Sequence, residues 1–137
     1  MPKPVTTYAY YPVETYRRVL LVVQNCEAVC ENTVTSVLGM CDQARVMQVR
    51  MLCDCADMCA LTAKYIARCS MLAKKHAVIC ADICEMCGNH GLMQPDGQSK
   101  ECGRICLECA KECVDFAGMN MPYGRAWAPG YGFFGRK

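Results

Sequence analysis

The chain has 137 residues, with 15 basic against 13 acidic side chains, a formal net charge of +2 and 14 cysteines. This length fits one domain with a core of useful size. The nearly neutral charge argues against a nucleic-acid partner or an anionic membrane surface. The longest aliphatic run, Val19 to Val23, is too short to span a bilayer.

The N-terminal residues lack the basic, apolar and small-residue order of a secretory signal, so we expect a cytoplasmic protein. In a reducing compartment, many cysteines indicate metal binding or catalysis rather than disulfide bonds. Local geometry agrees, because cysteines four residues apart on a helix have Cβ atoms too far apart for an unstrained disulfide. We therefore expect reduced thiols when no metal is bound.

The predicted elements begin with residues 1–12, an extended segment rich in Tyr, Thr and Pro. Helical periodicity starts near Pro12, a residue suited to a first helical turn, and continues to a break around Gly39. A second helix is predicted over about 41–68, because Leu52 and Ile66 share a face with cysteines between them.

The second half of the chain predicts two more helices. The third covers about 71–90, with Ser70 as its N-cap and Gly91 closing it. A turn signal at 94–97 precedes the fourth helix, which Ser99 caps and which ends near Ala117. No segment shows strand alternation. The predicted fold is therefore all-α, an antiparallel four-helix bundle over 13–117 with a cysteine-lined core.

Residues 118–137 differ in composition from the rest and predict an irregular tail. This segment has five glycines, two prolines, interleaved aromatic residues and a basic end. Such a segment is not expected to be helical. Its aromatic side chains either pack on the bundle or dock on a partner.

Cysteine spacing is the most informative feature of the chain. Most cysteines recur every three or four positions, and at about 100° per helical residue each run lies along one helix face. Inward-facing thiols from four helices would form a closed site for soft metal ions. The candidate metal ligands are Cys26, Cys30, Cys55, Cys59, Cys80, Cys84, Cys87, Cys102, Cys106, Cys109 and Cys113.

Charge neutrality selects among the soft metals. Thiolate sites bind Cu(I), Zn(II) or iron–sulfur clusters, and an uncompensated buried charge is very costly. Basic residues such as Lys74 and Arg104 lie off the cysteine faces, so the metal itself must balance the thiolates. A monovalent ion on each thiolate leaves the interior neutral. This reasoning predicts roughly ten to fourteen Cu(I) ions per chain.

Three motifs resemble the cysteine-rich four-helix-bundle copper storage proteins. They are Cys55-Ala-Asp-Met-Cys59, Cys80-Ala-Asp-Ile-Cys84-Glu-Met-Cys87-Gly-Asn, and Cys102-x3-Cys106-x2-Cys109-x3-Cys113. The resemblance covers roughly residues 26–115 and is to the cytosolic branch of the family. The chain has fewer cysteines than those members, which often have cysteine where Ala77, Gly91 and Ser99 stand here.

The resemblance implies a helical tube whose inward thiolates hold multiple Cu(I) ions, usually two-coordinate, for storage or detoxification. It also implies copper ions and copper chaperones as partners, and association of the bundles as tetramers. Self-association agrees with apolar residues that lie off the cysteine face of the first predicted helix, because such patches mark interfaces. These residues are Leu20, Leu21, Val29 and Leu38.

Three other interpretations remain open from the residues alone. The same thiols could hold an iron–sulfur cluster in an electron-transfer or sensor protein, or they could bind zinc, although zinc-knuckle spacing is absent. Cysteine could also serve only as a small apolar core residue. An enzymatic role is not expected, because no cysteine is paired with a suitably oriented histidine and no phosphate-binding loop occurs.

Three further residues are secondary candidates for metal ligation. His76 lies one turn before Cys80, at a predicted mouth of the bundle, and Cys41 and Cys69 lie near helix ends where copper could enter or leave. Cys53 lies nearly opposite Cys55 on the helix and is expected to point away from the core.

Overall fold

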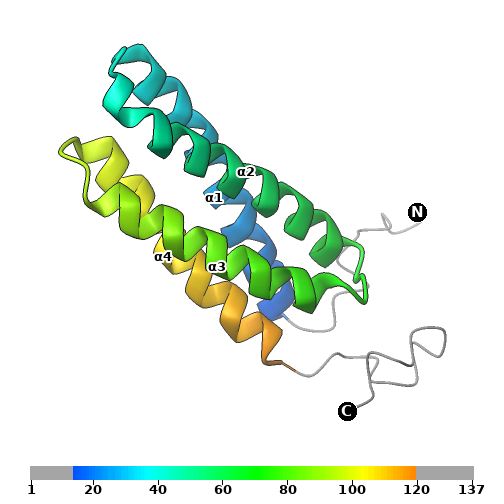
Figure 1. Ribbon diagram of the computed structural model, residues 1–137. Helices are drawn as coiled ribbons and strands as arrows, with labels where there is room; N and C mark the ends of the chain where they lie inside the picture. The colour runs from blue at the N-terminus through cyan, green and yellow to red at the C-terminus, as the bar shows by residue number, and fades with distance from the viewer. Residues whose placement is uncertain (1–13, 120–137) are drawn as a thin grey trace, which may run out of the picture.

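The computed structural model describes residues 14–119, which form four long antiparallel helices (Figure 1). Within this range there is no strand, which confirms the predicted all-α four-helix bundle. The predicted N-terminal segment and residues 120–137 of the tail lie outside the described residues. The helices are α1 (Glu14–Gly39), α2 (Val46–Ala67), α3 (Ala73–Leu92) and α4 (Gly97–Ala117), with a short 3₁₀ helix, η2 (Gln43–Arg45), before α2.

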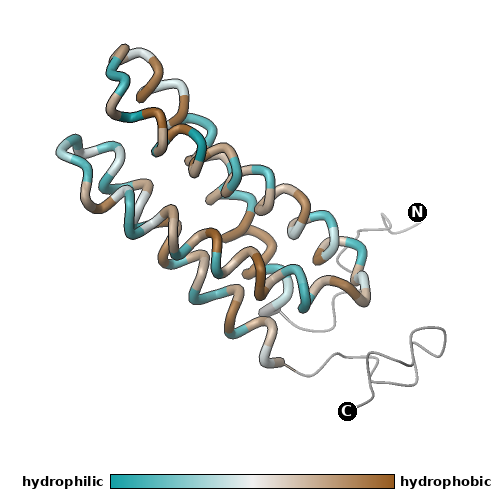
Figure 2. The backbone as a smooth tube through the Cα atoms, viewed as in Figure 1, coloured by the Kyte–Doolittle hydropathy of each residue, from teal (hydrophilic) through white to brown (hydrophobic). Residues whose placement is uncertain are grey.

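The bundle consists of two helical hairpins, α1–α2 and α3–α4, packed face to face. α1 lies beside α2 and α4, and α3 lies beside the same two helices. Hydrophilic and hydrophobic residues alternate along each helix (Figure 2), as expected for helices that bury one face and expose the other. Among the helices of residues 14–119, none combines the length and apolar character that crossing a membrane requires.

The helix boundaries differ from the sequence predictions at four places. α2 begins at Val46 rather than near 41, because residues 43–45 form the 3₁₀ helix η2. α3 begins at Ala73 rather than near 71, although the Ser70 hydroxyl does accept a hydrogen bond from the Leu72 N–H at 3.0 Å. Gly91 lies inside α3 instead of closing it. The N-cap of α4 is Asp96, whose carboxylate accepts from the Ser99 N–H at 2.9 Å.

The turns after α1 and α2 are made by cysteines in the left-handed backbone region. Cys41 has φ of 53° and Cys69 has φ of 52°. Glycine or asparagine usually occupies this position after a helix, because a side chain is disfavoured there. The chain therefore reverses direction at two residues whose side chains the sequence analysis considered only as metal ligands.

Glycines bring α3 and α4 into close contact. A Cβ atom added to Gly103 would lie 2.7 Å from the carbonyl oxygen of Gly88, and one added to Gly91 would lie 2.9 Å from the carbonyl oxygen of Ser99. Such distances exclude any side chain without a shift of the helices. The small residues at these positions therefore let α3 and α4 pack closely in the hairpin.

The core changes character along the bundle axis. At the end formed by the start of α1 and the end of α4 it is apolar, with Tyr16 packed edge-on against Phe116 at a ring-centroid distance of 5.1 Å. Thiols fill the middle. The opposite end is polar and includes Arg45 and Gln48, which are 7% and 2% exposed. Leu20, expected on the outer surface of α1, is buried in the apolar part instead, at 9% exposed.

Candidate metal centre

All eleven principal candidate cysteines point into the bundle, and none is more than 4% exposed. Each helix contributes at least two of them, because the three- and four-residue spacing keeps each run on the buried face. All fourteen cysteines of the chain lie within the described residues and are free thiols. The inward thiols are Cys26 and Cys30 on α1, Cys55 and Cys59 on α2, Cys80, Cys84 and Cys87 on α3, and Cys102, Cys106, Cys109 and Cys113 on α4.

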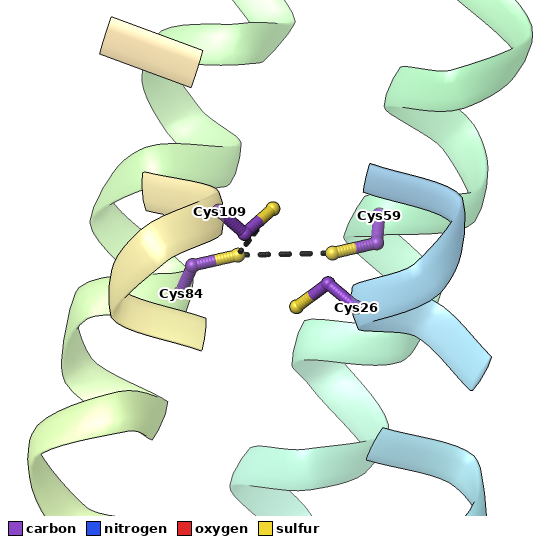
Figure 3. Close-up of side chains that lie close together, drawn as sticks. All are labelled: Cys26, Cys59, Cys84 and Cys109. Carbon is purple, nitrogen blue, oxygen red and sulfur yellow. Dashed lines mark hydrogen bonds between the residues drawn. The ribbon is translucent and has the colours of Figure 1, made fainter. Parts of the chain in front are cut away.

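Two groups of four thiols have all their Sγ atoms within 4.8 Å of one another. One group takes one cysteine from each helix, and in Figure 3 the Cys59 and Cys84 side chains extend toward each other between the two hairpins, with Sγ atoms 3.7 Å apart. Because the two groups share Cys26, they form one continuous cluster. Their members are Cys26, Cys59, Cys84 and Cys109, and Cys26, Cys30, Cys55 and Cys106.

The cluster extends in both directions along the axis. Toward the apolar end, Cys80, Cys109 and Cys113 form a third group with Sγ atoms within 4.8 Å. Toward the polar end, the Cys102 Sγ atom lies 3.9 Å from that of Cys30. Cys87 is buried on the same face of α3, at 4% exposed, but belongs to none of the three groups. The thiols thus form a column rather than one isolated tetrahedral site.

Neighbouring thiols control the ionisation of this column. S–H donation from Cys106 and Cys30 lowers the pKa of Cys102 to about 4, against the opposing effect of burial. The pKa of Cys113 is raised, because its own S–H interacts with Cys109 and Cys80 and because burial disfavours the thiolate. Burial disfavours the charged form of every thiol in the column, so full deprotonation requires cations among the sulfurs.

The basic residues that the sequence predicts to lie off the cysteine faces do lie away from the sulfurs. Arg45, which the sequence did not single out, is a further basic residue near the core. Lys75, Arg104 and Lys111 are exposed and Lys74 is half-buried, whereas Arg45 is buried at the polar end. The position of Arg45 was detectable, because residues 45, 48, 52, 55 and 59 continue the cysteine face of α2 at helical spacing.

Arg45 is held in a hydrogen-bonded network that joins the two hairpins. Its guanidinium donates to the carboxylate of Asp96, to the Ser99 Oγ at 3.0 Å and to the Gln48 Oε1 at 2.7 Å. Burial alone would raise the pKa of Asp96, but bonds from Arg45 and from the Ser99 N–H outweigh it and lower that pKa to about 2. Because Asp96 neutralises Arg45, this cation does not compensate the thiolates.

The three secondary candidates lie outside the thiol column. Cys41 is exposed, and Cys69 is half-buried with a pKa that burial raises. The His76 ring packs edge-on against Tyr65 at 4.5 Å, and its buried Nδ1 atom has no hydrogen-bond partner among residues 14–119. None of the three belongs to a thiol group. Their part in metal entry stays a prediction.

Two buried threonines border the column and differ in their hydrogen bonding. The Thr33 hydroxyl donates to the carbonyl oxygen of Val29 at 2.7 Å, one turn earlier in α1. The Thr62 hydroxyl is equally buried but has no partner in the described part of the chain. An unsatisfied buried hydroxyl carries a desolvation cost.

A sequence model described as that of the copper storage proteins matches residues 13–118, most of the chain. Among curated proteins, the Bacillus subtilis (strain 168) protein YhjQ, described as an uncharacterized cysteine-rich protein, is 31% identical over 94 residues. That match covers 68% of this chain and 87% of YhjQ.

Two solved structures resemble the bundle closely. The Cu(I)-bound copper storage protein BsCsp3 matches with a TM-score of 0.73 and 27% identity, over 77% of this chain and 100% of its own. The apo form of copper storage protein 3 from Bacillus subtilis matches with a TM-score of 0.70 and 28% identity, over 74% of this chain and 98% of its own.

Proposed function

The chain belongs to the copper storage protein family, and we propose that it binds and stores multiple Cu(I) ions through the thiolates of its eleven inward cysteines. The observation that carries this proposal is the continuous column of buried thiols, in which the two four-thiol groups share Cys26. The likeness to a structure described as Cu(I)-bound supports the choice of metal. Copper is here the cargo of the protein rather than a catalytic cofactor.

Charge balance supports monovalent ions. When Cu(I) binds a thiol, the S–H bond breaks, a Cu–S bond forms and one proton leaves, so no redox change is needed. Each Cu(I) ion replaces one proton, so the net charge of the dry interior stays neutral. A zinc ion on four thiolates would leave two negative charges among the buried sulfurs. Arg45 does not offset them, because it is paired with Asp96.

The capacity follows from the same balance. With one ion per inward thiolate, the saturated chain holds about eleven Cu(I) ions, within the range expected from the sequence. Soft thiolates shared between neighbouring ions suit this packing, because cysteines of adjacent groups have Sγ atoms close together, as for Cys55 and Cys84 at 3.6 Å.

Anaerobic titration with Cu(I) against a competing chelator tests the proposal. We expect saturation near eleven equivalents per chain, and a lower capacity in Cys26→Ala because two thiol groups lose a member. The matched control is Cys53→Ala, which removes a half-buried thiol outside all three groups and should leave the capacity unchanged. Saturation at one or two equivalents, or iron in the protein purified without air, would contradict copper storage and support the iron–sulfur alternative.

We also propose that the protein is a non-enzymatic store in the cytoplasm that exchanges copper with chaperones and forms oligomers, with the tetramer as the expected state. Exposed apolar side chains on α1, Leu21 and Leu38, each 59% exposed, support self-association. Light scattering coupled to size-exclusion chromatography gives the mass directly. A monomer at all concentrations would contradict the oligomeric part of the proposal and leave copper binding untouched.

A further inference from the structure

A groove of about 390 Å³ lies on the outer surface between α2 and α3, on the side of these helices that faces away from the thiols. Met51, Met58 and Leu61 line it from α2, and Ile83 and Met86 line it from α3. Met86 is 62% exposed. Flexible thioethers in an apolar groove fit aromatic rings well, since sulfur–aromatic contacts are favourable by about 0.3–1.5 kcal/mol each.

The groove has an acidic border. Asp54 and Asp57 line it together with the methionines, and both are exposed. Neither carboxylate forms an ion pair with any residue of 14–119. The groove is therefore suited to a partner that combines aromatic and basic side chains.

Residues 120–137 of this chain have that composition. They contain five aromatic residues, three basic residues and no acidic residue. The copper storage protein model matches residues 13–118, so the fold shared with the family does not include this segment. The aromatic residues are Tyr123, Trp127, Tyr131, Phe133 and Phe134, and the basic ones are Arg125, Arg136 and Lys137.

The tail starts close enough to reach the groove. α4 ends at Ala117, and Met119 packs against the core at the apolar end of the bundle, where α2 ends and α3 begins. Leu61 and Met58 lie about 8–12 Å along α2 from Ile66 at that end. Crossing α3 adds roughly 10 Å to the path from α4 to the groove. The eighteen residues of the tail, if extended, span up to roughly 60 Å, which is longer than this path.

A second apolar depression competes for the same segment but fits it less well. It is lined by residues including Leu38 and Val46, and Arg50 stands on its border. It lies at the polar end of the bundle, near the turn between α1 and α2, far from the point where the chain leaves α4. Both its charge and its position disfavour a basic tail.

We propose that the aromatic and basic tail, residues 120–137, docks in the α2–α3 groove of its own chain, with aromatic rings against Met51, Met58 and Met86 and basic groups beside Asp54 and Asp57. The covered groove then forms a continuous apolar surface over the outside of the thiol column. The proposal does not depend on copper binding, because every lining residue lies outside the thiol groups.

Methyl NMR of the metal-free protein, labelled with ¹³C at the methionine methyl groups, tests the docking. The full chain is compared with a chain ending at Met119, with circular dichroism showing that both retain the bundle. We expect ring-current shifts of the Met51, Met58 and Met86 methyl signals in the full chain only. Met47 and Met93, which are 57% and 80% exposed elsewhere on the surface, serve as internal controls and should not change. Unchanged groove signals, or shifts at the control methionines alone, would overturn the proposal.

Charge reversal and dilution give independent readouts. Trp127 is the only tryptophan, so its emission reports on the tail. In the Asp54→Lys, Asp57→Lys double variant we expect Trp127 emission to move to longer wavelength and the methyl shifts to be lost. Glu31→Lys, an exposed change on α1, should alter neither. Shifts that grow with protein concentration would assign the groove to the tail of a second copy and overturn docking within one chain.

Discussion

The two ends of the bundle are closed in different ways, although the same four helices form both. At one end Tyr16, Phe116 and Ile66 fill the core with large apolar side chains, none more than 1% exposed. At the other end an ion pair between buried Arg45 and half-buried Asp96 joins the two hairpins. Between them the core consists mainly of small thiols. The difference places the side chains that close the bundle apart from the thiol column.

This separation has an energetic reason. A buried thiol adds less apolar area than a leucine or phenylalanine, so the middle of the metal-free bundle contributes little to folding. The ends must hold the helices together before copper binds. We therefore expect substitutions at the ends to change stability but not copper capacity, and cysteine substitutions in the middle to lower copper capacity with a smaller effect on stability.

The largest effect is expected at the apolar end. Phe116→Ala removes a fully buried ring that packs edge-on against Tyr16, and it should lower the free energy of unfolding of the metal-free protein by about 3–5 kcal/mol. Urea denaturation followed by circular dichroism measures this. Val114→Ala, at a position 58% exposed, is the control and should change stability by less than about 0.5 kcal/mol. A loss of copper capacity in a folded Phe116→Ala protein would argue against the separation.

A smaller effect is expected at the polar end. Asp96→Asn keeps an N-cap for α4, since asparagine caps as well as aspartate, but removes the charge that pairs with Arg45. We expect a loss of about 1.5–3 kcal/mol at neutral pH, measured by denaturant unfolding. Arg45→Met in the same background completes a double-mutant cycle that isolates the pair.

The pH dependence of this loss has a definite sign. The pKa of Asp96 is lowered from its ordinary value of 3.8 to about 2 in the folded protein. Its contribution to stability is therefore fully present above the unfolded value and is lost as the pH falls through the folded one. The stability difference between the native protein and Asp96→Asn should shrink between about pH 4 and pH 2. A difference that stays constant over that range would show that the ion pair is not its cause.

The smallest effects are expected at the two threonines that border the thiols. Thr62→Val removes a buried hydroxyl with no partner in the described residues and should stabilise the metal-free protein by about 1 kcal/mol. Thr33→Val breaks a bond to the Val29 carbonyl oxygen and should destabilise it by about the same amount. Thermal unfolding of both variants measures the contrast. Shifts of the same sign would mean that the Thr62 hydroxyl is bonded in solution.

The inward direction of the cysteines was predictable because it depends only on local helical geometry. A run such as Cys102, Cys106, Cys109 and Cys113 lies on one face of any regular helix, whatever surrounds it. The same rule predicts that Cys53, nearly opposite Cys55 and Cys59, points away from the core, and in the structure Cys53 is half-buried and belongs to no thiol group. The helix ends were less predictable. Ser70 and Ser99 both fit a capping pattern, yet Asp96 caps α4 and Ser99 became a buried acceptor for Arg45.

By itself, therefore, the sequence determined the all-α class, the thiol faces and the resemblance to copper storage proteins, since each follows from spacing along one helix. Only the tertiary structure decided which thiols meet, how the Gly88 and Gly103 backbones bring α3 against α4, and that Arg45 is buried and neutralised by Asp96. The physical reason is that these features join residues distant in the chain. Their distances depend on the packing of four helices at once, and no periodicity within one helix records that packing.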